Sequence, residues 1–86
     1  QSLAYKYSNR KIDPLLVTLN PKNSPEKVSH KGQEFNYCLE GRMMVIIGNE
    51  EYILEPGDSL YFNSVKPHKM IALDGKEAKY LTVILL

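Results

Sequence analysis

Two histidines and one glutamate in this sequence have the residue types and spacing of metal ligands. His30 precedes Glu34 by four residues, where a loop enters a predicted strand, and His68 comes after a Pro-Gly turn and one further strand. If folding brings these side chains together, two imidazoles and one carboxylate line one small cavity. Such a set suits a divalent transition metal with open coordination positions, and it does not choose among Zn, Fe, Mn, Ni and Cu.

Each of these residues also has a structural explanation. His30 can be an exposed loop histidine, and Glu34 can be one of the solvated glutamates that are common on strands. His68 follows Pro67, whose fixed φ stiffens the approach to the strand, so a structural role at the mouth of the fold is an alternative to metal binding. The sequence leaves both explanations open and assigns no catalytic residue.

Short strands separated by turn residues must position these side chains. No apolar pattern with a period of 3.6 residues is long enough to compete with them. Gly48-Asn49 is typical of a two-residue hairpin, Pro56-Gly57 of a type II turn, and Asp74-Gly75 of a hairpin between the last two strands. The rhythm of about eight strands predicts an all-β sandwich or barrel, with strands near residues 3–7, 14–19, 34–39, 42–47, 51–54, 59–62, 69–73 and 79–85.

Strand alternation assigns faces around Glu34. If Glu34 points into the fold, Asn36 and Cys38 share its inner face, because side chains on a strand alternate with a period of two. Asn36, Cys38 and Tyr61 are therefore the candidate ligand-binding residues. Burial as a small hydrophobe is the alternative for Cys38, and ordinary packing is the alternative for Tyr61.

An apolar outer face predicts a homodimer. Phe35, Tyr37 and Leu39 fall on the face opposite Glu34, and the unbroken apolar run at residues 43–47 indicates a strand that is covered on both sides. A second copy of the domain would bury this surface. The alternative is that residues 3–7 of the same chain cover it.

Composition sets further limits. The 86 residues suit a single domain, and the start at Gln1 without an initiator methionine suggests that residues 1–86 are a fragment of a longer chain. A net charge of +1 gives no electrostatic case for a nucleic-acid surface, and no apolar run approaches the roughly 20 residues of a membrane span. The single cysteine cannot form an internal disulfide, which favours a reducing, cytoplasmic location.

The block from His30 to His68 resembles the two conserved motifs of the cupin superfamily. In the first motif His30 takes the place of the second histidine, Glu34 that of the glutamate and Gly41 that of the glycine beyond the strand. In the second, the Pro56-Gly57 turn is followed by His68. The position of the first histidine is taken by Val28, and the asparagine often found after the last histidine is absent.

This resemblance runs from about Pro14 to the end of the chain. It implies a double-stranded β-helix, or jelly-roll, barrel with three of the usual four metal ligands. The Gly32-to-Gly41 and Glu55-to-Phe62 blocks are similar to cupin domains that follow helix-turn-helix domains in transcriptional regulators. In that interpretation the barrel dimerises, binds a small-molecule effector near His30 and His68, and contacts no DNA itself.

Two alternative functions remain from the same resemblance. The first is a small metal-dependent cupin enzyme, an oxygenase or isomerase, in which His30, Glu34 and His68 hold the metal. The second is a barrel that only stabilises a neighbouring domain or a dimer. An upstream helix-turn-helix segment in the full gene product would favour the regulator over both.

Overall fold

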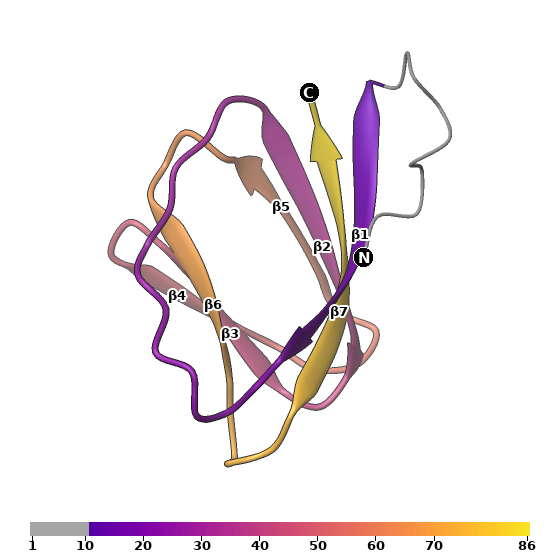
Figure 1. Cartoon of the computed structure of the whole chain (residues 1–86), viewed down its shortest axis with the longest axis vertical. Helices are drawn as coiled ribbons and strands as arrows, with labels where there is room; N and C mark the ends of the chain where they lie inside the picture. The colour runs from indigo at the N-terminus through magenta and orange to yellow at the C-terminus, as the bar shows by residue number, and fades with distance from the viewer. Residues whose placement is uncertain (1–10) are drawn as a thin grey trace.

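The computed structural model describes residues 11–86 and forms seven β-strands in this range (Figure 1). None of the elements in this range is a helix that is long and apolar enough to cross a membrane. The predicted strand at residues 3–7 lies outside the described residues. The strands are β1 (Ile12–Leu19), β2 (Gln33–Glu40), β3 (Met43–Ile47), β4 (Glu50–Leu54), β5 (Ser59–Asn63), β6 (His68–Ala72) and β7 (Ala78–Leu85).

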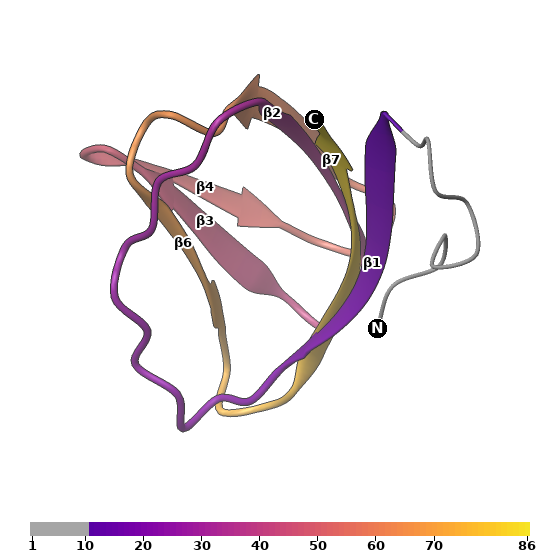
Figure 2. The ribbon, with the colours of Figure 1, turned by 45° about the horizontal axis from the view of Figure 1, so that its top comes forward.

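The strands form two antiparallel sheets that face each other. The four-stranded sheet has the order β1-β7-β2-β5, and the three-stranded sheet has the order β4-β3-β6. Only the β3–β4 hairpin joins neighbouring strands of one sheet; the connections β2–β3, β4–β5, β5–β6 and β6–β7 all cross from one sheet to the other (Figures 1 and 2). This all-β arrangement is the predicted jelly-roll of the cupin type.

Local turn chemistry sets the predicted reversals. Gly48 has a φ of +59° and forms, with Asn49, the two-residue connection of the β3–β4 hairpin. The turn before β5 closes through a 2.8 Å hydrogen bond from the Asp58 amide to the Glu55 carbonyl. Gly57 stands third in this turn with a φ of +95°, as a type II turn requires.

The predicted hairpin of the last two strands is wrong. Asp74 and Gly75 do form a tight turn, in which the Lys76 amide donates to the Leu73 carbonyl at 3.2 Å. However, β6 pairs with β3, and β7 pairs with β1 and β2. A turn fixes where the chain reverses, but the strand that leaves it can pair with a neighbour in the other sheet.

The core lies between the two sheets, and strand alternation decides which residues enter it. On β2, Glu34, Asn36 and Cys38 are buried, whereas Tyr37 and Leu39 are exposed, as the alternation predicts. On β3 the same alternation buries three residues and leaves Met44 and Ile46 half-buried on the outer face. The buried apolar side chains are Cys38, Met43, Val45, Ile47, Leu54, Phe62, Ala78 and Tyr80.

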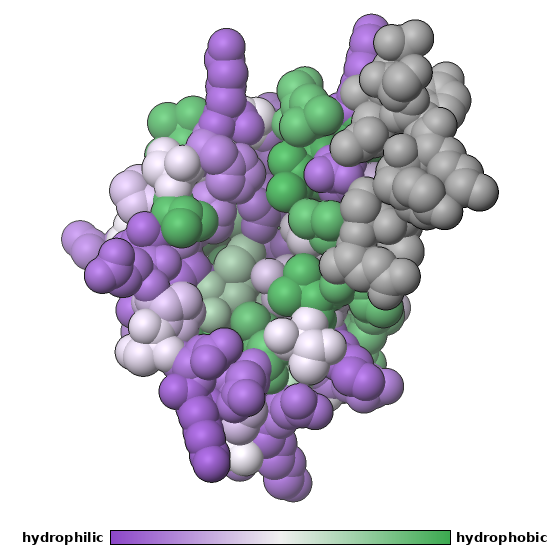
Figure 3. All heavy atoms as spheres, viewed as in Figure 1, coloured by the Kyte–Doolittle hydropathy of each residue, from purple (hydrophilic) through white to green (hydrophobic). Residues whose placement is uncertain are grey.

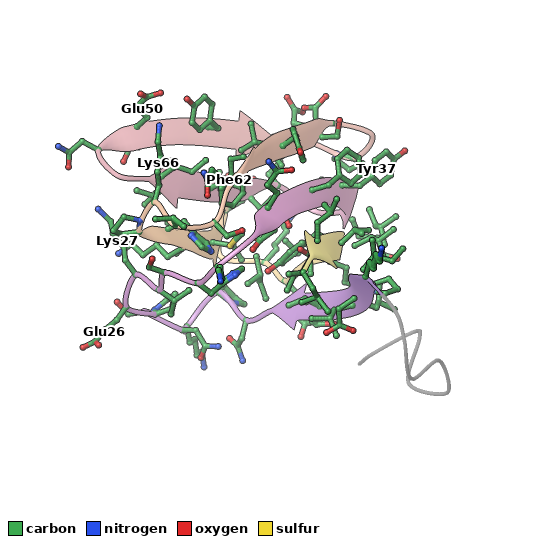
Figure 4. The ribbon with its side chains drawn as sticks, turned by 90° about the horizontal axis from the view of Figure 1, so that it is seen from above. Glu26, Lys27, Tyr37, Glu50, Phe62 and Lys66 are labelled. Atoms are coloured by element: carbon green, nitrogen blue, oxygen red, sulfur yellow. The ribbon has the colours of Figure 1, made fainter. Side chains whose placement is uncertain are left out.

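Side chains from both sheets fill the space between them. Seen from above, Phe62 lies among the side chains between the two layers, whereas Tyr37 lies at the outside (Figure 4). From the front, apolar atoms are visible in a hollow between hydrophilic rims (Figure 3). The interior is therefore apolar along most of its length, and the polar residues of the candidate site stand out within it.

Candidate metal centre

The three predicted metal ligands come from both sides of the barrel. His30 lies in the loop before β2, three residues ahead of its start. Glu34 is the second residue of β2, and His68 is the first residue of β6. Because β2 and β6 belong to different sheets, the cluster spans the gap between the layers.

Backbone contacts hold the loop that carries His30. The His30 amide donates to the Ser64 carbonyl at 3.0 Å, and the Ser64 amide donates to the Gly32 carbonyl at 3.0 Å. Gly32 itself has a φ of +102°, and a Cβ built on it would lie 2.1 Å from the Leu85 carbonyl oxygen. Only glycine therefore lets the chain pass the end of β7 and turn into β2 at the spacing that the cluster needs.

The ligand atoms of the cluster converge. The Nε2 atom of His30 lies 3.1 Å from Oε1 of Glu34, and the Nε2 atom of His68 lies 3.5 Å from the same oxygen. One ligand atom from each of the three residues lies within 4.8 Å of the others. Metal–ligand bonds of about 2.1 Å at right angles separate neighbouring ligand atoms by about 3 Å, so the cluster has the dimensions of a metal site.

The outer ring nitrogens of both histidines are engaged by backbone carbonyls. His68 Nδ1 lies 2.7 Å from the Lys66 carbonyl, and His30 Nδ1 lies 3.3 Å from the Lys31 carbonyl. A carbonyl oxygen only accepts, so the ring form with its proton on Nδ1 satisfies these contacts and keeps the Nε2 lone pair available to a metal. In that form the two Nε2 atoms and Oε1 of Glu34 face one another, so the residues fit a metal ion.

Asn36 orients the carboxylate from behind. Its Nδ2 donates to Oε2 of Glu34 at 3.2 Å, which leaves Oε1 free to face the two histidines. Glu34 and His68 are buried, whereas the His30 side chain is 35% exposed. His30 therefore forms the solvent side of the cluster. His68 is not at the exposed mouth of the barrel, since its ring packs edge-on against Phe62 with centroids 5.0 Å apart.

Tyr80, which the sequence analysis did not single out, is a further buried residue near the cluster. Burial, together with the negative charge of Glu34, raises the pKa of its phenol to about 12. The hydroxyl group therefore stays protonated at neutral pH and remains a hydrogen-bond donor. The proximity to Glu34 depends on the pairing of β7 with β2, which no local sequence pattern reports.

A cavity of about 230 Å³ adjoins the cluster and shares His68 with it. It lies between β6 and the loop that follows β1, and its wall is mostly apolar. Its lining residues outside that loop are Leu19, His68, Lys69, Met70, Ile71 and Tyr80.

The three predicted ligand-binding residues occupy different places. Asn36 touches Glu34, as described above. Cys38 is on the same inner face further along β2, where its thiol donates to the Gly41 carbonyl at 3.3 Å and burial raises its pKa. Tyr61 pairs with Phe35 on the outer face of the four-stranded sheet, is 58% exposed, and donates its hydroxyl to the Gln33 side chain. The structure does not bring Tyr61 to the cluster.

Three buried side-chain oxygens have no hydrogen-bond partner within residues 11–86. They are Oδ1 of Asn36, Oγ of Ser64 and Oγ1 of Thr82. Asn36 and Thr82 are opposite each other in the β2–β7 register, two residue pairs beyond Glu34 and Ile84. Buried polar atoms of this kind are ordinarily hydrogen-bonded to water or a ligand. The interior near Glu34 therefore suits a water molecule or a polar group of a ligand.

The fold and the cluster agree with the comparison to protein families. Residues 15–84 match the cupin domain family, and the chain belongs to that family. None of the curated proteins matches the chain.

Solved structures with the same fold include an iron protein and domains of transcriptional regulators. FeII HppE in complex with substrate is 30% identical, with a TM-score of 0.76, and the match covers 87% of this chain and 46% of that chain. The cupin domain of an XRE family transcriptional regulator from Enterobacter cloacae is 20% identical, with a TM-score of 0.89, over 100% of this chain and 93% of that one. An HTH_3 family regulator from Vibrio cholerae is 20% identical, with a TM-score of 0.83, over 100% of this chain and 49% of that one. The chain thus spans about half the length of HppE.

Proposed function

We propose that this cupin domain binds one divalent transition metal through His30, Glu34 and His68, and binds a small-molecule effector beside it as the regulatory domain of a helix-turn-helix transcriptional regulator. The observation that carries the proposal is the convergence of three ligand atoms within 4.8 Å, next to a cavity that shares His68. Two histidines and a carboxylate leave coordination positions open for water or a ligand. A bound metal would supply a Lewis-acidic centre for an effector oxygen or nitrogen.

Ferrous iron is the first metal to test. A face of two histidines and one carboxylate is typical of non-haem Fe(II) sites. The 30% identity to a protein solved with FeII supports the same choice. The position expected for a fourth ligand holds Val28, whose side chain cannot bind a metal and whose backbone exchanges two 2.9 Å hydrogen bonds with His68.

The regulatory role is favoured by what surrounds the metal ligands. The cavity wall is mostly apolar, and the phenol of Tyr80 is held in its protonated form, so neither supplies a base for proton abstraction. The full-length similarity to the cupin domain of an XRE family regulator is consistent with such a role. An effector regulates only if it binds one arrangement of the protein better than another.

A homodimer through the outer face of the four-stranded sheet would provide those two arrangements. This face carries Tyr37, Leu39 and Tyr61, each more than a third exposed. Half-buried Phe35 is paired with Tyr61 on β5 and with half-buried Val83 on β7. Contiguous apolar surface of this kind marks an interface. Sedimentation should show a dimer that Leu39→Glu dissociates, whereas Ile53→Glu, on the outer face of the other sheet, should leave it intact. A wild-type monomer at all concentrations would contradict this part of the proposal.

Metal analysis tests the central claim. Protein purified without a metal-affinity tag, then titrated anaerobically with Fe(II), should bind one equivalent, and Zn, Mn, Ni and Cu should compete. His68→Ala should abolish binding. Because His68 is buried, circular dichroism and thermal unfolding must accompany that variant. Wild-type protein that binds none of these metals would refute the ligand set.

The second candidate function is a metal-dependent enzyme, and the identity to HppE in its substrate complex is the observation that favours it. The discriminating measurement is dioxygen consumption by the Fe(II)-loaded protein in the presence of a small-metabolite extract. Turnover that Glu34→Gln abolishes would favour the enzyme. Saturable binding without turnover, in a gene product with an upstream helix-turn-helix segment, would favour the regulator.

A further inference from the structure

The hydrogen-bonding direction of β6 can be derived from the bonds at its two ends. The Gly48 amide donates to the Pro67 carbonyl at 2.8 Å, and the Leu73 amide donates to the Arg42 carbonyl at 3.0 Å. In an antiparallel ladder, alternate residues point their N–H and C=O groups to the same neighbour. Residues 67, 69, 71 and 73 therefore face β3, and residues 68, 70 and 72 face away from it.

The outward edge of β6 begins a second ladder that stops after one pair. His68 exchanges two 2.9 Å hydrogen bonds with Val28, which precedes β2. The continuing register would place Glu26 opposite Met70, but the Val28–His68 pair is an isolated bridge and residues 20–27 form no strand. Within residues 11–86, the N–H and C=O groups of Met70 on this edge have no hydrogen-bond partner.

The diverging segment, residues 20–27, is here called the strap, and the cavity lies between it and β6. Figures 1 and 2 show the strap passing in front of β6 and rejoining the body before β2. The strap is tied down at its end by Lys27, whose Nζ donates to the Gly48 carbonyl at 2.6 Å. Figure 4 shows Glu26 and Lys27 pointing outward from the strap, so neither charge fills the cavity.

We propose that this cavity binds a small, uncharged molecule with a secondary amide between apolar groups. The Met70 N–H and C=O groups present one donor and one acceptor side by side, which is the complement of a single amino-acid residue in an added strand. Leu19, Pro25 and Ile71 provide apolar walls. The wall is mostly apolar and Glu26 points outward, which favours an uncharged ligand over an ion.

The size of the cavity limits the ligand to a small free molecule. A volume of about 230 Å³ corresponds to roughly eight water molecules at about 30 Å³ each. A capped single residue is of this size, whereas a longer peptide strand is not. The inference that this amide is the effector rests on the proposed regulatory function. The inference that the cavity binds an amide does not depend on the metal.

Amide binding can be measured on metal-free protein by ¹⁵N-edited NMR. The probe is N-acetyl-L-alanine N′-methylamide. Its control is the O-acetyl-L-lactic acid N′-methylamide, in which an ester oxygen replaces the donor N–H. We expect saturable shifts centred on the amides of Met70, Ala72 and Val28, and about tenfold weaker binding of the ester, since one hydrogen bond is lost. Met70→Pro removes the N–H group of the β6 edge. The affinity of this variant for the probe should fall to the affinity of the wild type for the ester.

Three results would overturn the inference. They are the absence of saturable shifts at the solubility limit of the probe, equal binding of the amide and the ester, and stronger binding of a capped tetra-alanine, which would indicate a protein strand as the partner. If Met70→Pro fails to fold, the relative affinity of the wild-type protein for the amide and the ester still tests the inference. Metal content, measured separately, shows whether the proposed metal function fails together with this site or independently of it.

Discussion

The Nε2 atom of His68 lies 3.5 Å from Oε1 of Glu34, although the two residues stand 34 positions apart and on strands of different sheets. The ring of His68 is held from its other side by the Lys66 carbonyl. Neither group can turn away without losing a contact or exposing a buried polar atom. The fold therefore presents two buried ligand atoms to each other, and both could bind one cation between them.

Removing the charge of Glu34 should destroy the metal site and retain the fold. Glu34→Gln keeps the size of the side chain but replaces a carboxylate oxygen by a weaker ligand. We expect metal affinity, measured by calorimetry, to fall more than about a hundredfold, since even residues behind the ligands are worth about 10 to 100-fold. Glu40→Gln, on the same strand but exposed, is the matched control and should bind as wild type. Equal affinity in the Glu34 variant would exclude Glu34 as a ligand.

Asn36→Leu tests whether orientation of the carboxylate matters. Leucine has the branching of asparagine but is somewhat larger, and it cannot donate to Oε2 of Glu34. Metal affinity should fall about 10 to 100-fold, less than for Glu34→Gln, because the ligand remains but is no longer held in place. Unfolding in urea should show at most a small loss of stability, since the unpartnered Oδ1 is removed as well. An unchanged affinity would show that Asn36 has a packing role only.

The cluster of His30, Glu34 and His68 could be predicted from the sequence because its signals are local. The four-residue spacing of His30 and Glu34, the turn at Pro56-Gly57 and the alternation along β2 each depend on neighbours in the chain. They fix which face of a strand a side chain occupies. These face assignments, combined with the jelly-roll topology that the motifs implied, predicted that His68 lies close to Glu34.

The remaining features depend on contacts between segments that are distant in sequence. The Asp74-Gly75 turn specifies a reversal, and only competition between the two sheets decides that β7 joins β1 and β2. The burial of Tyr80 in the same interior as Glu34 follows from that pairing. The Val28–His68 bridge is likewise a single long-range contact that leaves no periodic pattern in the sequence.

Gly32 is the position where a small substitution should disturb both the fold and the cluster. A Cβ at this position would lie 2.1 Å from the Leu85 carbonyl, and the φ of +102° is itself unfavourable for alanine. Gly32→Ala should lower the free energy of unfolding by about 3 kcal/mol or more and weaken metal binding. Gly57→Ala is the control, with a φ of +95° but no atom within 4 Å of its Cβ; it should cost only about 1 to 2 kcal/mol. Equal losses in the two variants would contradict the steric argument.

Tyr80 should make the domain sensitive to alkaline pH. Its pKa of about 12 in the folded protein exceeds the ordinary tyrosine value of 10.0, so the unfolded chain loses this proton at lower pH than the folded one. Unfolding then releases a proton, and stability falls as pH rises from about 10 to 12, by about 2 to 3 kcal/mol at 1.36 kcal/mol per pKa unit. Tyr80→Phe should remove this part of the decline and leave the pH dependence below about pH 9 unchanged. Urea unfolding of the two metal-free proteins at a series of pH values measures the difference, and curves that stay parallel up to pH 12 would show that the phenol ionises equally easily in both states.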